Sequence, residues 1–485
     1  MKKSICLILL IARAAVFPQT SFLPFIEKIN SSPAGNIIII PDGVYTAENS
    51  VKITASGTAD KPIIIKTQNP GKAVIRGSSG IVIADASFLI FDGFFFEHED
   101  KTPALSLKNI RNLQILRCRF RLAEPEPRRQ HWLYISGASS SNRIAHCLFE
   151  EKHNEGNFIA LGGTTEPLAM AQYTVIVSNA FINIGPRIEN GKEAVRIGDS
   201  KTSMSFAFTI LENNYFENCD GDPEVISVKS CGNILRFNTL RNCRGGLVLR
   251  HGNMNRAEAN LFWGNGRKEG LEGMRFYGDD HIIVNNYFFN LTKSSITVEN
   301  GDYLPAGKPE DVPVSDRKLH HVPRNILIAH NTIINCPTMV ISDVQTGKYN
   351  IPFEKIIIIN NLIWSRSAPA PVIPPGASGL QINNNLGFSD DGITGSGIKG
   401  MIIADPEMIL RSGIYYLSKN SPAVDRAVSA DRQILSDFKN QPRFEKPDIG
   451  ADEYRETGTA AAPADWQKLT PFTPVFSSLP SDIKY

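Results

Sequence analysis

Residues 213–240 read NNYFENCDGDPEVISVKSCGNILRFNTL, and this stretch decides the fold. It holds two copies of a four-residue pattern, in which Asn or Cys stands second and Phe, Leu or Ile stands last. The copies end at Phe216 and Leu240, and a short apolar, β-branched segment lies between them. A short strand between two such turns is typical of one coil of a solenoid.

The same pattern recurs along most of the chain. Its copies are 22 to 45 residues apart. The intervals vary but none is shorter than 22 residues. This predicts a repeat with a fixed minimum coil length and with loops of variable length. The Asn or Cys of the pattern stands at positions 118, 147, 179, 214, 238, 260, 286, 331, 361 and 384.

These repeats predict an all-β fold, a single-stranded parallel β-helix, because one coil can bury its apolar face only against its neighbours. The recurring Asn side chains are expected to form a ladder that hydrogen-bonds each coil to the next. A β-propeller is disfavoured because its blades need about 40–50 residues each. A TIM barrel is disfavoured because no amphipathic helix of sufficient length separates the strands.

The two ends of the chain carry different signals. Residues 1–19 begin with MKK and a short apolar run, which is typical of a secretory signal peptide and too short for a membrane span. Residues 21–34 predict a short amphipathic helix that caps the open end of the solenoid. The β-helix domain is expected over 20–457, with YYLSKNSPAVD and PDIGADEY in its last coils, and an extended tail over 458–485. The mature protein is expected in the periplasm or outside the cell, as a monomer.

Composition is that of an ordinary folded protein. The chain has 485 residues, of which 42% are hydrophobic, so a large core can be buried. The formal net charge of +2 predicts no general affinity for nucleic acid, and a polyanionic partner would need local basic groups. Six cysteines remain beyond Cys6, and most follow the repeat, which favours stacked buried thiols. A Cys219–Cys243 disulfide is less favoured, and metal ligation is disfavoured because no CxxC pair occurs.

Two acids and a lysine lie in one segment, and an arginine follows about one coil later. Asp222 and Glu224 stand two residues apart, so an extended strand points both carboxylates the same way, in outline a hard-cation site. Lys229 follows five residues later, and Arg250 follows twenty-one residues after Lys229. Because stacked strands lie about 4.8 Å apart, Lys229 and Arg250 are expected to project side by side.

At this point the sequence resembles a known family. NGKE at 190–193, DPEVISVKSC at 222–231 and LVLRHGN at 247–253 resemble polysaccharide lyase family 6, the family of alginate lyases and chondroitinase B. The resemblance covers most of the chain, including DIGADEY near its end. It implies a right-handed parallel β-helix that cleaves a uronate polysaccharide by β-elimination, usually with calcium. Alginate is the expected substrate because most of the family acts on it, and dermatan sulfate is the alternative.

The resemblance also implies a role for each residue of the block. The calcium ligands fall on Asn190, Asp222 and Glu224, where Asp222 is one methylene shorter than the Glu of the relatives. The Brønsted base falls on Lys229 and the Brønsted acid on Arg250.

Two further residues are implied at the substrate site. His251 follows the arginine directly, although it could equally have a structural role. Arg275 corresponds to a basic residue that binds a substrate carboxylate, although it could instead pair with Asp279 or Asp280.

The chemistry of β-elimination accounts for these residue types. Removing the C5 proton of a uronate leaves a carbanion beside a carboxylate, and a bound cation stabilises that charge. Calcium prefers oxygen ligands and leaves positions for substrate. Lys229 must be neutral to accept the proton, and calcium and Arg250 nearby are expected to favour the neutral amine. Arg250 would protonate the leaving O4 through a water or stabilise its charge, since a guanidinium scarcely deprotonates.

Other interpretations are open. GDDH at 278–281 resembles the paired aspartates of inverting β-helix glycosidases, but the other glycosidase blocks are missing. A non-catalytic glycan-binding solenoid would not need Lys229 and Arg250 together, and both residues could simply be solvated on an outer face. An insertion at 292–323 is expected to border the groove and to shape substrate subsites, because long loops on a rigid scaffold often line sites.

Overall fold

The computed structural model describes residues 19–47, 51–99, 102–124, 127–305, 311–337, 339–342, 349–365, 377–390, 398–429 and 434–456. The predicted signal peptide up to residue 18 and the predicted tail from residue 458 lie outside these ranges. Within them, the structure contains no helix that is both long and apolar enough to cross a lipid bilayer.

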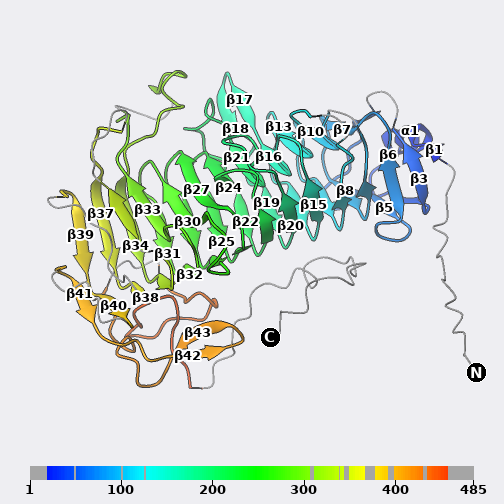
Figure 1. Cartoon of the computed structure of the whole chain (residues 1–485). Coiled ribbons are helices and arrows are strands. Elements are labelled where there is room, and N and C mark those ends of the chain that lie inside the picture. The colour runs from blue at the N-terminus through cyan, green and yellow to red at the C-terminus, as the bar shows by residue number, and fades with distance from the viewer. Residues whose placement is uncertain are drawn as a thin grey trace, which may run out of the picture.

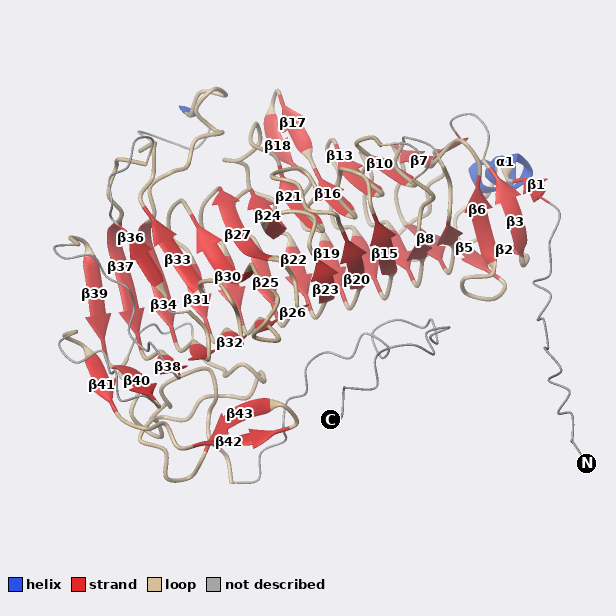
Figure 2. Ribbon diagram, viewed as in Figure 1, coloured by secondary structure: helices blue, strands red, loops and turns tan. Residues whose placement is uncertain are grey.

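The described chain winds into a right-handed parallel β-helix, which confirms the predicted fold (Figure 1). Over the described residues, three parallel sheets of 15, 11 and 13 strands run along its length, and a typical coil contributes one short strand to each sheet. Figure 2 shows that strands and loops make up nearly all of the described chain, with a helix at the N-terminal end.

The strands follow one another in sheet order with almost no deviation from sequence order. The 15-stranded sheet comprises β1 (Gln19–Ser21), β3 (Gly43–Thr46), β6 (Ala73–Arg76), β9 (Phe95–Phe96), β12 (Arg119–Phe120), β15 (Leu148–Lys152), β20 (Ala180–Ile184), β23 (Tyr215–Cys219), β26 (Thr239–Arg241), β29 (Leu261–Trp263), β32 (Tyr287–Phe289), β35 (Thr332–Ile334), β38 (Leu362–Ser365), β40 (Asn385–Ser389) and β41 (Met401–Ile403). The 11-stranded sheet comprises β4 (Val51–Ile53), β7 (Ile81–Ala84), β10 (Leu105–Lys108), β13 (Leu133–Ser136), β16 (Ile159–Leu161), β21 (Val195–Gly198), β24 (Glu224–Lys229), β27 (Gly245–His251), β30 (Leu271–Phe276), β33 (Ile296–Glu299) and β36 (Val340–Ser342). The 13-stranded sheet comprises β2 (Ile37–Ile40), β5 (Ile63–Thr67), β8 (Leu89–Asp92), β11 (Gln114–Leu116), β14 (Arg143–Ala145), β19 (Val175–Val177), β22 (Ile210–Glu212), β25 (Ile234–Arg236), β28 (Arg256–Glu258), β31 (Ile282–Val284), β34 (Arg324–Ala329), β37 (Glu354–Ile359) and β39 (Leu380–Asn383).

An asparagine ladder fixes the register between coils, as predicted. The Oδ1 atom of Asn238 accepts hydrogen bonds from the backbone N and from Nδ2 of Asn214, at 3.1 and 3.0 Å. Asn238 in turn donates to Oδ1 of Asn260, which repeats the arrangement one coil later. Each buried amide therefore satisfies a backbone donor that the turn would otherwise leave unpaired.

The last member of the ladder is Asn385, and its prediction at position 384 is wrong. Asn361 donates its backbone N–H to Oδ1 of Asn385 at 2.9 Å. Asn384 instead adopts a left-handed conformation and donates its side chain to Asn360. Three asparagines stand in a row at 383–385, so the four-residue pattern alone could not select the inward one.

The six cysteines of the described ranges are free and buried, which confirms stacked thiols. Cys118 and Cys147 occupy ladder positions, and the backbone N of Cys118 lies 3.4 Å from Sγ of Cys147. Cys219 and Cys243 form no disulfide.

The N-terminal end is capped by α1 (Leu23–Asn30), as predicted. Phe22, Ile26 and Ile29 are buried at this end of the core. The helix therefore covers the apolar end of the first coils, where a β-helix would otherwise expose its interior (Figure 1).

The C-terminal segment does not form the last coils, contrary to the prediction. YYLSKNSPAVD begins in the antiparallel hairpin of β42 (Met408–Arg411) and β43 (Ile414–Leu417). Ile414, Tyr416 and Phe438 pack on outward-facing side chains of the 15-stranded sheet, including Leu261 and Tyr287. This face carries large apolar groups that need cover, so the chain folds back along the side of the β-helix instead of extending it.

Candidate active site

The predicted catalytic residues lie on adjacent strands of the 11-stranded sheet. Glu224 and Lys229 begin and end β24, Arg250 lies in β27, and Arg275 lies in β30. The strand order β30-β27-β24-β21 makes these segments neighbours. Asn190 lies exposed in the segment that precedes β21.

The register between β24 and β27 differs from the expected one. Val228 pairs with Leu249, but Lys229 pairs with His251, so the register shifts by one residue between these pairs. Arg250 is the extra residue of this bulge, so Lys229 and Arg250 lie on adjacent strands but are not paired in register. β-bulges are common next to active sites, where they redirect a side chain.

Two arginines converge on one carboxylate. Arg250 donates from Nη1 to Oε1 of Glu224 at 2.8 Å, and Arg275 Nη2 lies 3.7 Å from the same oxygen. Glu224 is 5% exposed, so this interaction is largely shielded from water. The alternative pairing of Arg275 with Asp279 or Asp280 is wrong, because Asp279 pairs with Arg324 and Asp280 accepts a hydrogen bond from Asn325.

Lys229 has a buried carboxylate partner that the sequence did not predict. Its Nζ lies 3.3 Å from Oε1 of Glu193, and Asn157 donates from Nδ2 to Oε2 of Glu193 at 2.8 Å. Burial alone would raise the pKa of Glu193, but Lys229 and Arg196, together with hydrogen bonds, lower it. The buried carboxylate therefore holds the amine of Lys229 from one side.

Glu193 is the last residue of the NGKE motif, so a sequence signal existed. Its position in the motif gave no reason to connect it with Lys229, which follows 36 residues later. Strand β21 begins two residues after Glu193 and pairs with β24, Gly198 lying opposite Lys229. The stacking of coils therefore brings the carboxylate to the lysine.

Asp222 is a buried acid beside other acids. Its two oxygens accept the backbone N–H groups of Glu224 and Lys192, at 2.9 and 3.2 Å. Burial, the charge of Glu193 and, to a smaller extent, that of Glu224 raise the pKa of Asp222 to about 7. The largest opposing effects are the hydrogen bonds from the backbone.

The side-chain donor atoms at this site are of the kind that calcium binds. Asn190, Asp222 and Glu224 offer only oxygen ligands, which calcium prefers. A cation would also relieve the repulsion that raises the pKa of Asp222. Throughout the described ranges, no three His, Cys, Asp or Glu side chains are arranged to hold a metal by themselves. The amide of Asn190 and oxygens from water or substrate would therefore have to complete the coordination.

His251 lies at the site but is buried. It is 2% exposed, its Nε2 lies 3.4 Å from Oγ of Ser200, and its ring centroid lies 5.8 Å from that of His320. Burial, followed by the charge of Arg250, lowers the pKa of His251 well below its usual value. A neutral ring in this position supports Ser200 and His320 more directly than it can reach a ligand.

The insertion at 292–323 reaches the site, as expected for a loop that borders it. His320 packs on His251 and also on Tyr277, at a centroid distance of 4.4 Å. Arg317 donates to the carbonyl of Lys201 at 3.2 Å, which ties the insertion to the segment beside His251.

The outer face of the same sheet carries polar residues that the sequence did not single out. Tyr134, Arg196 and Ser227 lie in one row across β13, β21 and β24. His131 precedes this row and accepts the backbone N–H of Asn157 at Nδ1, at 3.1 Å. Aligning coils would have found these residues, but the varying loop lengths conceal the alignment.

Known proteins show the same architecture and family. The family model for chondroitinase B matches residues 23–389. The PL6 family alginate lyase AlyGC is 27% identical, with a TM-score of 0.70, and the match covers 92% of this chain and 60% of AlyGC. The chain thus spans less than two thirds of AlyGC. No curated protein sequence matches the chain significantly.

Two other solved structures extend this likeness. A mannuronic acid specific polysaccharide family 6 lyase from human gut microbiota is 25% identical, with a TM-score of 0.71, over 80% of this chain and 90% of that one. The PL6 family lyase Pedsa3628 from Pseudopedobacter saltans is 20% identical, with a TM-score of 0.62, over 93% and 98%, and supports the fold alone. Because the chondroitinase B model covers well over half of the chain, the protein belongs to that family of polysaccharide lyases, polysaccharide lyase family 6.

Proposed function

We propose that the protein cleaves a uronate-containing polysaccharide, alginate in the first instance, by β-elimination. The observation that carries this proposal is that Lys229 and Arg250 lie on adjacent strands and that each contacts a buried carboxylate. Glu193 contacts Lys229, and Glu224 contacts Arg250. A solvated surface lysine and arginine would not need buried partners. Alginate is favoured because AlyGC is an alginate lyase and the gut relative is specific for mannuronic acid.

Lys229 is proposed as the Brønsted base that removes the C5 proton. Its side chain is only 12% exposed, and Glu193 fixes its Nζ from one side. Lys229 acts as a base in its neutral form, and Glu193 serves to orient the amine. The substrate would approach the amine from the side that Glu193 leaves open.

Arg250 and Arg275 are proposed to act on the anionic parts of the substrate. Arg275 would bind a uronate carboxylate, and Arg250 would stabilise or, through a water, protonate the leaving O4. Their shared partner Glu224 keeps the two guanidinium groups together. His251 is proposed to support this end of the site by packing under Ser200 and His320.

Calcium is proposed as the cofactor, held by Asn190, Asp222 and Glu224. When bound, it would neutralise the substrate carboxylate and so acidify the C5 proton. In its absence, Asp222 would remain partly protonated near neutral pH, since its pKa is raised to about 7. Location outside the cytoplasm remains a prediction, because the predicted signal peptide lies outside the described residues. A monomeric state likewise remains a prediction.

Incubation of the purified protein with alginate and, separately, with dermatan sulfate tests the proposal. A rise in ultraviolet absorbance from the unsaturated uronate product, dependent on calcium and lost in Lys229→Ala, is expected with alginate. Lys268→Ala is a matched control, because Lys268 is also a partly buried lysine paired with an acid, Asp220. A rise with dermatan sulfate alone would reassign the substrate. Retained binding to both polymers without any rise would identify a non-catalytic glycan-binding protein.

A further inference from the structure

A ladder of left-handed turn residues runs along the corner between the 11-stranded and 13-stranded sheets. Asn112, Ser141, Tyr173 and Phe208 have φ values of 54°, 57°, 56° and 48°. The backbone N–H groups of Ser141 and Tyr173 each donate to the next coil, at the carbonyls of Gln172 and Ala207. These residues are therefore structurally equivalent positions in successive coils.

Four members of the ladder carry bulky side chains. The left-handed region suits Gly, Asn, Asp and Ser, whereas a bulky side chain there is strained. Phe88, Tyr173, Phe208 and Met254 nevertheless occupy it, and Tyr173 is 52% exposed and Phe208 37% exposed. Neither the backbone nor the core requires an aromatic residue at these positions.

The exposed rings form an ordered row. The rings of Tyr173 and Phe208 stack at a centroid distance of 5.3 Å and an interplanar angle of 11°, and Phe206 stacks on Phe208 at 5.2 Å. Gly232, the next member of the ladder, leaves space for them, because a Cβ atom there would lie 2.9 Å from the Phe208 ring. The row is thus a flat aromatic surface, built on strained backbone.

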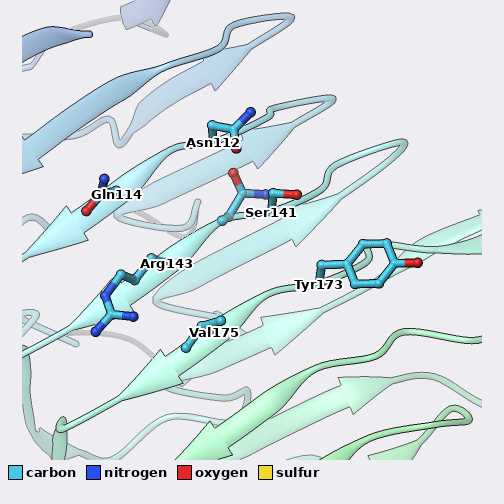
Figure 3. A pocket seen from close by; sticks show the side chains of 7 residues that line it. Asn112, Gln114, Ser141, Arg143, Tyr173 and Val175 are labelled. Carbon is cyan, nitrogen blue, oxygen red and sulfur yellow. The ribbon is translucent and has the colours of Figure 1, made fainter. Parts of the chain in front are cut away.

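A cavity of about 300 Å³ adjoins this row (Figure 3). Gln114, Arg143 and Val175 line it from neighbouring strands in register, and Tyr173 lies at its edge. Arg143 is the only charged residue of the lining, and the amides of Gln114 and Asn112 supply further donors and acceptors. An acidic sugar ring would find a cation, amides and a flat apolar face here.

We propose that this corner, formed by the rings of Tyr173, Phe206 and Phe208 with Arg143 and Gln114, is a second binding site for the uronate polysaccharide, outside the active site. Aromatic rings pack against the apolar faces of sugars, and a guanidinium pairs with a carboxylate in a defined orientation. A row of stacked, exposed rings beside a cavity lined by a cationic side chain points to such a function.

The corner and the active site share one connecting segment, residues 199–209. Ser200 lies beside His251 near its start, and Phe206 and Phe208 lie near its end. A polymer long enough to occupy both sites would gain affinity from the second contact without any new contact at the first. The proposal rests on the proposed function for the identity of its ligand, because both sites are assigned the same polymer.

Electrophoresis of the full chain through gels that contain alginate or dermatan sulfate tests the second site. The background is Lys229→Ala, so that the polymer is not degraded. In this background, Tyr173→Asn with Phe208→Asn, and separately Arg143→Gln, are expected to weaken retardation about tenfold, the equivalent of losing one or two good contacts. Asn suits a left-handed turn, so the double variant should melt at the same or a higher temperature than its parent.

Matched controls remove an exposed ring or a surface charge elsewhere. Phe444→Asn removes a ring that is 51% exposed, and Arg411→Gln removes an exposed arginine in β42, and both should leave retardation unchanged. Unchanged retardation of the corner variants would overturn the proposal. A lower melting temperature of the double variant would also overturn it, because the ring row would then stabilise the fold.

Turnover separates this proposal from the proposed function. With Lys229 intact, the corner variants should cleave short oligosaccharides as the parent does and polymer less well. If the protein cleaves neither polymer, the proposed function fails, yet retardation that depends on Tyr173, Phe208 and Arg143 still supports the second site. If the parent is not retarded by either polymer, the second site is overturned whatever the enzyme cleaves.

Discussion

Lys229 Nζ lies 3.3 Å from Oε1 of Glu193, a carboxylate that is 1% exposed. Asn157 holds the other oxygen of Glu193 at 2.8 Å. The lysine therefore rests against an oriented, buried anion, which positions the amine. The contribution of this contact to turnover can be measured by experiment.

Glu193→Gln is expected to lower kcat by about tenfold, because the amine loses a charged partner that orients it. Steady-state turnover of alginate by the variant and the parent is the decisive measurement.

Glu212→Gln provides the control, because Glu212 pairs with Arg236 at 2.7 Å on the 13-stranded sheet, away from the site. It should leave kcat unchanged. A wild-type kcat in Glu193→Gln would contradict the role of Glu193 in orienting the amine.

Calcium is expected to raise the thermal unfolding temperature of the protein near pH 8 and to have no such effect on Asp222→Asn. A ligand present at about 100 times its dissociation constant stabilises the folded state by about 2.7 kcal/mol, which is readily measured by calorimetry. Replacing Asp222 removes a carboxylate from the predicted set and leaves Glu224 with Arg250.

Asp220→Asn is a control of the same charge change two residues away. Asp220 pairs with Lys268 at 2.6 Å, so its loss should lower the unfolding temperature but preserve the increment that calcium adds. An equal increment in Asp222→Asn would contradict the predicted ligand set.

His131 predicts a loss of stability in acid. Burial, followed by the charges of Arg196 and Arg129, lowers the pKa of His131 from 6.5 to about 3. Between these values the unfolded chain binds a proton that the folded protein does not, so the free energy of unfolding falls as pH decreases through this range. Protonation would also remove the Nδ1 acceptor that holds the backbone N–H of Asn157.

His131→Gln is expected to reduce this acid sensitivity, because a glutamine oxygen can accept the same hydrogen bond and does not titrate. Urea unfolding of both proteins at neutral pH and near pH 4 measures the difference. The prediction is contradicted if both proteins lose the same free energy of unfolding between the two pH values.

The sequence predicted the parts of the molecule that each coil repeats. Asn238 and its equivalents recur because every turn has the same unpaired backbone donor, so one short pattern found the ladder and the fold. Glu193 was missed because its partner Lys229 lies in the next coil, and coil lengths vary by whole loops. The one-residue bulge at Arg250 has no distinct signal, since it depends on how β24 and β27 pair.

The C-terminal fold-back could not be predicted for a related reason. Leu261 and Tyr287 follow the ladder pattern as ordinary strand residues, and nothing in their sequence shows that they point outward. Only the three-dimensional arrangement of coils creates an apolar outer face that Tyr416 and Phe438 can cover. Such contacts between distant segments follow from the shape of the whole solenoid.

The position of Lys229 also depends on a glycine in the preceding coil. Gly198 has a φ of 93°, and a Cβ atom there would lie 2.3 Å from the carbonyl oxygen of Lys229. Gly198→Ala is therefore expected to destabilise the protein by about 2 kcal/mol or more and to displace the end of β24. Gly43→Ala is the control, since the nearest atom to a Cβ there, in Tyr45, is 3.5 Å away. If Gly198→Ala kept the wild-type free energy of unfolding and full turnover, the close approach of the two coils would not be what places Lys229, and Glu193 alone would have to fix the amine.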